Sequence, residues 1–476
     1  MGGESQNPSK DGAPQDGSFY PADAQKLQTY KDAGTALSEF KAPVLIHANN
    51  PHERLFVACM DGTGNDEVAD PQHKTNVAKI NDQVTALRLG GSNQIHNGYV
   101  AGPGTQSGAI ASTLDGMSGA TYNKRTEEMY KQFIDQAWKW KREDPQAQIR
   151  TADIGFSRGA EQAAGFSRLV QERGIQDPTG AKYTRRSDGM ITHVEYTKKP
   201  LVPPGEVAQA VGLFDPVGTG NPMKHQDRRL PPSVISGFQI NADDERRGLF
   251  KSDRIIKPGE SVDGRFLAVN VAGAHSDVGG SYLRDGLAIR SNNLMTDYLN
   301  GLSDKPYLQK QAEPTDQRLN VVHRSEQSML LYKFYPKIDR TGPGGYNDLL
   351  VPRNQIGRVG DAYHAEPRNE SLSNQFERQK VKIGALPAPQ QAATAATNDL
   401  SSRLDNMLAA GRSGDRAAFR ADTQALANSD AARTMQNQAA TTINRQALAQ
   451  QPQAPSQPSQ QPMQQQTPAV GNGPQR

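Results

Sequence analysis

The sequence contains a single cysteine, Cys59, among its 476 residues. One cysteine cannot form an internal disulfide and cannot supply the thiolates of a cysteine-based zinc cluster, so both are excluded. Long hydrophobic runs are also missing. No stretch approaches the ~18 consecutive apolar residues of a membrane-spanning helix, so no transmembrane segment is predicted.

An excess of charge of one sign is missing as well. Lys and Arg number 54 and Asp and Glu number 51, which gives a formal net charge of +3. This balance does not indicate a nucleic-acid partner. Residues 1–17 are polar and lack the apolar core of a secretory signal peptide. We therefore expect no export by the general secretory route, whereas export by a dedicated machine leaves no such mark.

Apolar and aromatic residues are scarce toward the C-terminus. Hydrophobic residues make up 35% of the chain, less than the ~45–50% of ordinary globular proteins, even allowing for glycine. The last residues are rich in Gln and Pro, a composition typical of disorder. We predict a polar N-terminal segment that can form a helix at residues 1–52 and a large folded domain at residues 53–345. A linker at 346–398, a small helical segment at 399–449 and a disordered tail at 450–476 follow it.

Short apolar runs alternate with amphipathic runs in the middle of the chain. Strands alternating with helices indicate a mostly parallel sheet with helices on both faces. In such sheets ligands bind at the carboxyl ends of the strands. Strands are predicted at residues 54–60, 95–100, 148–155, 207–214 and 265–271, and helices at 21–40, 125–141, 158–172 and between Thr75 and Gly90.

The segment Gly155-Phe156-Ser157-Arg158-Gly159 has the pattern G-x-S-x-G. The bare motif is weak, but here it follows a predicted strand and precedes a helix of small residues. That context is typical of a nucleophile elbow, in which a tight turn exposes the serine and the two glycines avoid clashes. The alternative is an ordinary turn whose serine caps the helix. We favour Ser157 as a nucleophile.

Asp215 and His275 each follow a predicted strand. With Ser157 they stand in the order Ser, Asp, His that α/β-hydrolases use. Taken singly, Asp215 could be a turn cap and His275 a loop histidine, but order and placement together favour a triad. Asp277 is close to His275 in sequence. Since the triad acid must approach the imidazole from behind, we choose Asp215 and expect Asp277 to cap its own turn.

A hydrolase of this type also needs backbone N–H donors for the oxyanion. We expect one from Arg158, directly after the nucleophile, and another from Gly62 or Thr63 after the first strand. The alternative for that early loop is a phosphate-binding or structural turn, but it lacks the G-x-x-x-x-G-K pattern of a nucleotide site. No spacing of acidic residues argues for a metal, and the triad chemistry requires no cofactor.

The charge run at residues 243–247, DDERR, is a further feature. We favour a solvated helix start for it. The alternative is an internal ion-pair network behind the site.

Five segments of the chain together resemble one protein family. They are VACMDGTGND, VAGPGTQ, IGFSRGA, GLFDPVG with DDERRGLF, and AGAHSDVGGSY, at residues 57–66, 100–106, 154–160, 212–218 with 243–250, and 272–282. They are similar to the catalytic domain of the first family of bacterial type VI secretion lipase effectors, also known as a domain of unknown function of α/β-hydrolase type. The resemblance covers about residues 53–340. It implies an antibacterial lipase or phospholipase in which Ser157, Asp215 and His275 match the family's triad.

Residues 402–427, with the Gln-rich end, resemble more weakly the C-terminal signal domain of antibacterial type IV secretion effectors. The two resemblances imply synthesis in a bacterial cytoplasm, contact-dependent delivery through a secretion apparatus that recognises the C-terminus, and a cognate immunity protein. We therefore expect a serine hydrolase that cleaves phospholipid acyl esters. One alternative is a soluble carboxylesterase or thioesterase acting on small acyl substrates. Another is an inactive binding protein on a hydrolase fold.

Overall fold

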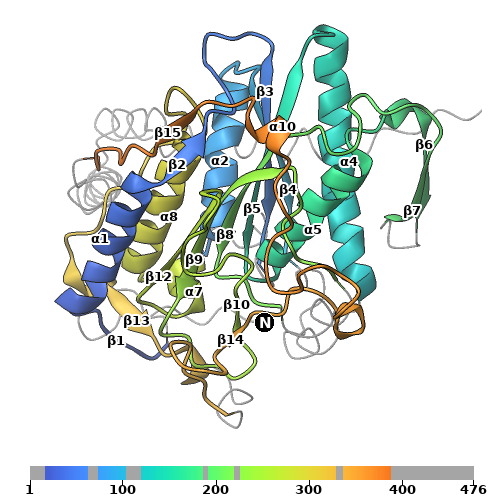
Figure 1. The fold of residues 1–476 in the computed structure, drawn as a ribbon. Helices are drawn as coiled ribbons and strands as arrows, with labels where there is room; N and C mark the ends of the chain where they lie inside the picture. The colour runs from blue at the N-terminus through green and yellow to red at the C-terminus, as the bar shows by residue number, and fades with distance from the viewer. Residues whose placement is uncertain are drawn as a thin grey trace, which may run out of the picture. The chain divides into compact units, whose positions relative to one another are not determined.

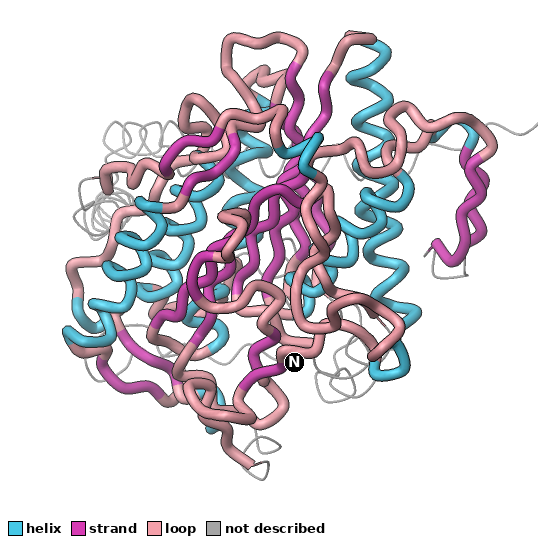
Figure 2. Tube along the Cα trace, viewed as in Figure 1, coloured by secondary structure: helices cyan, strands magenta, loops and turns pink. Residues whose placement is uncertain are grey.

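The computed structural model describes residues 17–62, 73–102, 119–185, 191–218, 226–327 and 336–387. Its centre is a seven-stranded sheet with the strand order β11-β12-β9-β8-β5-β3-β4 (Figure 2). The strands from β12 to β4 are parallel, and β11 (Gly259–Glu260) pairs antiparallel at one edge. The parallel strands, in chain order, are β3 Glu53–Met60, β4 Ile95–Val100, β5 Gln148–Phe156, β8 Gln209–Phe214, β9 Val234–Ala242 and β12 Phe266–Val271.

Helices cover both faces of the sheet (Figure 1). One face carries α1, α2 and α8, and the other carries α4 and α5. A hydrophobic core fills each face, and strands buried on both sides read as continuous apolar runs. The predicted fold class, a mostly parallel α/β sheet between helices, is therefore confirmed. The helices are α1 Ala24–Glu39, α2 Asn76–Leu89, α4 Gly119–Glu143, α5 Arg158–Arg173 and α8 Gly286–Asn300.

Strand β9 and helix α8 were not predicted from the sequence. All residues of β9 are buried, although polar side chains interrupt its apolar run. Those side chains find partners inside the fold. Gln239 Nε2 donates to Asn241 Oδ1 (2.7 Å), and Ser236 Oγ accepts from Tyr298 on α8 (3.0 Å). Buried polar groups with such partners are tolerated in a core, but they hide the strand from a hydrophobicity pattern.

The chain divides into two units, residues 1–389 and 390–476, and all described residues belong to the first. Helix α1 buries Leu37 on the sheet side of this unit. Residues 346–387, predicted as part of a linker, carry short strands of the same unit. β14 (Tyr346–Asn347) pairs with β10 (Ser252–Asp253), and β15 (Arg378–Lys380) pairs with β2 (Lys41–Pro43). The predicted segments 399–449 and 450–476 lie outside the described residues.

The strand order reverses next to β3. β4 lies on one side of β3, whereas β5, the next sheet strand along the chain, lies on the other. Such a reversal opens a crevice at the carboxyl ends of the two central strands, where ligands bind in open α/β sheets. The residues after β3, β5, β8 and β12 therefore gather at one edge of the sheet.

Two short elements outside the sheet complete this unit. The hairpin of β6 (Ala181–Arg185) and β7 (Ile191–Tyr196) lies against α4 (Figure 1). β1 (Phe19–Pro21) pairs antiparallel with β13 (Val321–His323). Within the described residues, no helix has both the length and the apolar composition needed to cross a bilayer.

Candidate active site

Ser157 stands between the end of β5 and the start of α5. Its φ of 59° and ψ of −125° lie in a region that residues other than glycine rarely adopt. Ser157 N donates to Phe214 O at 3.0 Å, and Ala160 N donates to Ser157 O at 3.1 Å, so neighbouring elements hold the turn. A strained serine at the carboxyl end of a central strand has the backbone arrangement of a nucleophile elbow.

The two glycines of the motif permit close packing around this turn. A Cβ atom on Gly155 would lie 2.3 Å from Gly159 O, and a Cβ on Gly159 would lie 2.1 Å from Met60 O on β3. Both clashes involve backbone atoms, which cannot move aside as a flexible side chain can. Glycine at both positions therefore lets α5 approach β3 and β5 closely.

We expect Gly159→Ala to lower the melting temperature, because the new Cβ overpacks the contact between α5 and β3 at a cost of ~1–3 kcal/mol. Gly34→Ala is the matched control, since its Cβ would lie 3.7 Å from Leu294 Cδ2, an ordinary contact. The control should be neutral or stabilising, because alanine favours the helix by about 1 kcal/mol over glycine. Thermal melts of both variants measure the difference. A Gly159→Ala protein that melts like the wild type would contradict this packing.

Asp215 and His275 form a buried pair. Asp215 directly follows β8, and His275 begins the short helix α7 (His275–Gly279) after β12. His275 Nδ1 lies 2.5 Å from Asp215 Oδ2, and the two side chains are 5% and 0% exposed. Since Nδ1 is engaged by the carboxylate, Nε2 is the ring nitrogen left to act on a nucleophile.

Helix α7 packs against the residue that precedes Ser157. The rings of Phe156 and His275 have centroids 4.6 Å apart, and a Cβ on Gly279 would lie 2.0 Å from the Phe156 ring. The structure thus brings Ser157, Asp215 and His275 to one edge of the sheet. The hydrogen bonds of the described residues join His275 to Asp215 but not to Ser157. Without substrate, such a catalytic bond is often long and tightens only in the complex.

Arg340 is a member of this site that the sequence analysis missed. Asp215 Oδ1 accepts hydrogen bonds from Arg340 Nη1 at 2.5 Å and from Ala242 N at 3.0 Å. Burial raises the pKa of Asp215, but Arg340 and His275 outweigh burial, so the net effect lowers that pKa. The acid therefore stays ionised although it is fully buried.

Glu245 lies on the backbone side of His275. It is fully buried and accepts from His275 N at 3.2 Å and from Arg247 Nη2 at 2.8 Å. Burial raises the pKa of Glu245, but Arg247 outweighs it and the pKa falls to about 2. The charge run at residues 243–247 is therefore not the solvated helix start that we favoured. Glu245 and Arg247 form the alternative, an ion pair behind the site, whereas Arg246 is exposed.

The same surroundings set the protonation state of His275. Burial lowers its pKa most strongly, because an imidazolium is poorly solvated in the interior, and Asp215 acts in the opposite direction. The net effect lowers the pKa of His275. The neutral imidazole is thus the resting form near neutral pH, as a general base requires.

Asp277 binds a different histidine. Its Oδ2 accepts from Ala274 N at 2.8 Å, so it caps its own turn as expected. Its Oδ1 lies 2.5 Å from Nδ1 of His323 on β13, and both side chains are 1% exposed. The His323 ring stacks on Tyr282, with centroids 3.7 Å apart. The sequence offered no signal for this second Asp–His pair, which holds the turn that carries His275.

The expected oxyanion donors are placed only in part. Gly62 N donates to Asp61 Oδ1 at 2.6 Å, so this N–H must leave its present partner to serve an oxyanion. Thr63 lies outside the described residues. Arg158 is the first residue of α5, and the backbone N–H groups of a first helical turn have no carbonyl partner within the helix. The oxyanion roles of all three residues stay predictions.

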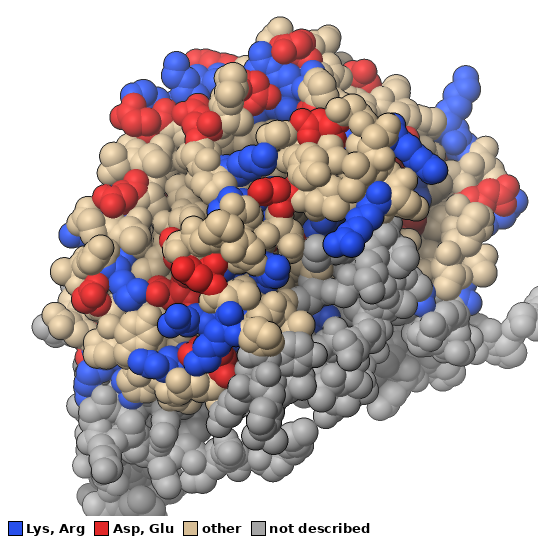
Figure 3. Space-filling model, turned by 60° about the horizontal axis from the view of Figure 1, so that its bottom comes forward, with Lys and Arg blue, Asp and Glu red and all other residues tan. Residues whose placement is uncertain are grey.

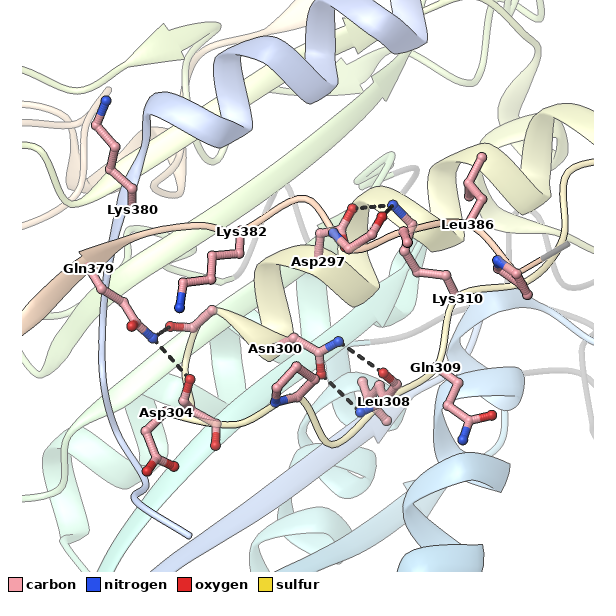
Figure 4. A pocket seen from close by; sticks show the side chains of 16 residues that line it. Asp297, Asn300, Asp304, Leu308, Gln309, Lys310, Gln379, Lys380, Lys382 and Leu386 are labelled. Atoms are coloured by element: carbon pink, nitrogen blue, oxygen red, sulfur yellow. Dashed lines mark hydrogen bonds and ion pairs between the residues drawn. The ribbon is translucent and has the colours of Figure 1, made fainter.

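A pocket of about 470 Å³ lies away from these residues, at the C-terminal end of α8 (Figure 4). Lys310 Nζ pairs with Asp297 at 2.6 Å, and Asn300 Nδ2 donates to Leu308 O at 2.9 Å. Asn76 Nδ2 donates to both Val278 O on α7 and Ala288 O near the start of α8, so the pocket lies at the end of α8 opposite to α7. A helix of 15 residues is about 22 Å long. The polar groups of the pocket hold a loop and take no part in the site.

A mostly parallel sheet between two helical layers, with polar residues at adjacent strand ends, places the chain among the α/β proteins that bind ligands at that end of the sheet. Residues 54–206 match the family model of the catalytic domain of Tle1-like phospholipase effectors of the type VI secretion system. The resemblance seen in the motifs is therefore confirmed over these residues. They include Ser157, whereas Asp215 and His275 lie beyond the match.

Solved structures are similar to this chain at low identity. A crystal structure of an uncharacterized protein from Pseudomonas aeruginosa is 17% identical, with a TM-score of 0.34, over 87% of this chain and 67% of that chain. The structure of the Tle1 effector bound to the VgrG spike from the type 6 secretion system is 18% identical, with a TM-score of 0.29. That similarity covers 51% of this chain and 57% of the effector. No curated protein matches the chain.

Proposed function

We propose that the protein is a serine hydrolase that cleaves acyl esters of phospholipids. The observation that supports this most directly is the 2.5 Å contact between His275 and Asp215 beside the strained turn of Ser157. The matched family model is that of phospholipase effectors, which supports the substrate class.

The reaction follows from the roles that the three side chains can fill. His275 Nε2 removes the proton from Ser157 Oγ as this oxygen attacks the ester carbonyl. Asp215 accepts the Nδ1–H hydrogen bond, fixes the tautomer and stabilises the imidazolium. Backbone N–H groups, with Arg158 the first candidate, hold the oxyanion. His275 then protonates the leaving alcohol, and water hydrolyses the acyl-enzyme by the same proton transfers in reverse.

The family match also supports a biological role. We propose that the protein is an antibacterial effector, delivered into a neighbouring cell by contact-dependent secretion, with an immunity protein as its inhibitor in the producing cell. We assign contact with the secretion apparatus to the C-terminal residues 399–476.

We expect the purified full chain to release fatty acids from phospholipid vesicles, as measured by mass spectrometry of the lipid products. On the described part of the face shown in Figure 3, basic and acidic side chains are intermixed. We therefore expect hydrolysis of zwitterionic as well as anionic vesicles, because no single-sign field on that part selects the lipid.

A soluble ester and an active-site probe separate the alternatives. Cleavage of a monomeric ester without fatty acid release from any vesicle would favour a soluble carboxylesterase or thioesterase. Failure of a fluorophosphonate probe to label the folded protein would favour an inactive binding protein.

A further inference from the structure

Arg340 adds a fourth side chain, which is positively charged, to the proposed triad. We propose that Arg340 is a positioning residue that acts through Asp215, fixing its carboxylate and setting the pH below which the Asp215–His275 couple stops acting as a base. This proposal rests on the proposed function of the site. The residue comes from the loop before β14, far along the chain from the strands that carry the triad.

The guanidinium group of Arg340 is held on several sides. Nη1 donates to Asp215 Oδ1 at 2.5 Å and to Ala242 O at 2.9 Å. Nε and Nη2 both donate to Phe250 O, at 3.0 and 2.6 Å. This fork joins the end of β9 to the acid, and Ala242 N donates to the same carboxylate oxygen at 3.0 Å. With Oδ1 held there and Oδ2 bound to His275, the orientation of the carboxylate is fixed.

The charge of Arg340 matters because water does not reach the pair. The side chains of Arg340 and Asp215 are 2% and 0% exposed. A carboxylate buried without a counter-ion takes up a proton and then no longer supports an imidazolium. A positive charge beside the couple disfavours uptake of a proton, whether the proton resides on the acid or on the imidazole. Removing that charge must therefore raise the apparent pKa of the couple.

Other charged groups also face the couple. Glu245 and Arg247, from the turn after β9, act on His275 in opposite directions. Asp243 interacts with both Arg340 and Asp215, and burial raises its pKa to about 6, so it titrates in the range of interest. Asp277, on the same short helix as His275, pairs with His323. Burial raises the pKa of Tyr282 to about 12, so its phenol is uncharged near neutral pH. Arg340 also lowers the pKa of Asp243 and of Glu245, so its replacement acts on them as well. An Asp243→Asn background removes the titration of Asp243 from the measurement.

The test measures the titration of His275 directly, by NMR of the full chain with ¹⁵N-labelled histidine. We expect Arg340→Met to raise the apparent pKa of the couple by about 1–3 pH units, both in the wild-type chain and in the Asp243→Asn variant. The acid limb of the pH profile of kcat/KM should move to higher pH by the same amount. Arg340→Lys keeps the positive charge but loses the planar guanidinium that bonds Asp215 and Phe250 O together. The acid limb should therefore stay near its wild-type pH while kcat falls.

Arg265→Met is the matched control. Arg265 is also a buried arginine, and it donates to one carboxylate, Asp263, and to the carbonyls of Val234 and Glu366. It lies at the amino end of β12, whereas His275 follows the carboxyl end of that strand. This variant should lose stability without moving the titration of His275.

An unchanged titration of His275 in folded Arg340→Met would overturn the proposal and leave Arg340 a structural cross-link. If Arg340→Met does not fold, Arg340→Lys decides. A normal kcat and pH profile in that variant would reject a positioning role. NMR reads the titration of the couple without turnover, so the two proposals can fail separately. If the wild-type protein cleaves no ester but Arg340→Met still raises the apparent pKa of the couple, the role of Arg340 is supported and the proposed function is rejected.

Discussion

Ser157→Ala is expected to lower kcat for ester hydrolysis on the order of 10⁶-fold, because the acyl-enzyme can no longer form. The fold should survive, since alanine is smaller than serine and adopts the same backbone at the same cost. Steady-state kinetics and a thermal melt of the same preparation give both results. Ser276→Ala, beside His275, is the control and should keep nearly full turnover.

Ser157→Gly adds a test of the turn itself. It also lacks the nucleophile, so it should be as inactive as Ser157→Ala. Glycine adopts a φ of 59° without strain, so we expect this variant to be more stable than the alanine variant by about 1 kcal/mol. Near-normal turnover in either variant would show that Ser157 is not the nucleophile. Equal melting temperatures would show that the turn is not strained.

Elements with local signals were predictable from the sequence. Helix α2 was expected between Thr75 and Gly90, and its N-cap is Thr75, whose side chain accepts from Ala78 N at 3.1 Å. The strand and helix that flank Ser157 also lie where they were predicted. Caps, apolar runs and glycine-flanked turns involve residues close in sequence, so a single chain is enough to reveal them.

The partners of buried charges were not predictable in this way. Arg340 and Asp215 are 125 residues apart, and His323 and Asp277 are 46 apart. Neither Arg340 nor His323 lies in a motif, and arginine is mostly exposed in proteins whereas histidine is intermediate, so residue type alone does not reveal that they are buried. The burial of Glu245 depends on where the turn after β9 packs. Such pairs are fixed by tertiary packing, which carries no periodic signal.

Asp215→Asn and Asp277→Asn are expected to fail in different ways. Asparagine has the size of aspartate and tolerates the positive φ of Asp215, 39°. The Asp215→Asn protein can present its amide to His275 and then favours the wrong tautomer, and it no longer neutralises an imidazolium. We expect kcat to fall by about 10²–10⁴. It should also lose stability, by up to about 3–5 kcal/mol, because Arg340 is left buried without its counter-ion.

Asp277→Asn should act mainly on stability. A cap alone is worth about 1 kcal/mol, but Asp277 also accepts from His323 N and pairs with the His323 ring. Losing these bonds in the interior should cost about 1–3 kcal/mol. Turnover should stay within about tenfold of the wild type below the melting transition, since the Asp215–His275 contact stays intact.

Kinetics and thermal melts of both variants, measured where each is fully folded, separate the two roles. Stability alone does not separate the two roles, because both aspartates have buried partners, Arg340 for Asp215 and His323 for Asp277. The pH profile adds a second criterion. Asp215→Asn should depress kcat at every pH, because no change of pH restores the lost carboxylate. If turnover collapses in Asp277→Asn and stays nearly normal in Asp215→Asn, then Asp277 is the catalytic acid and His323 becomes the candidate base.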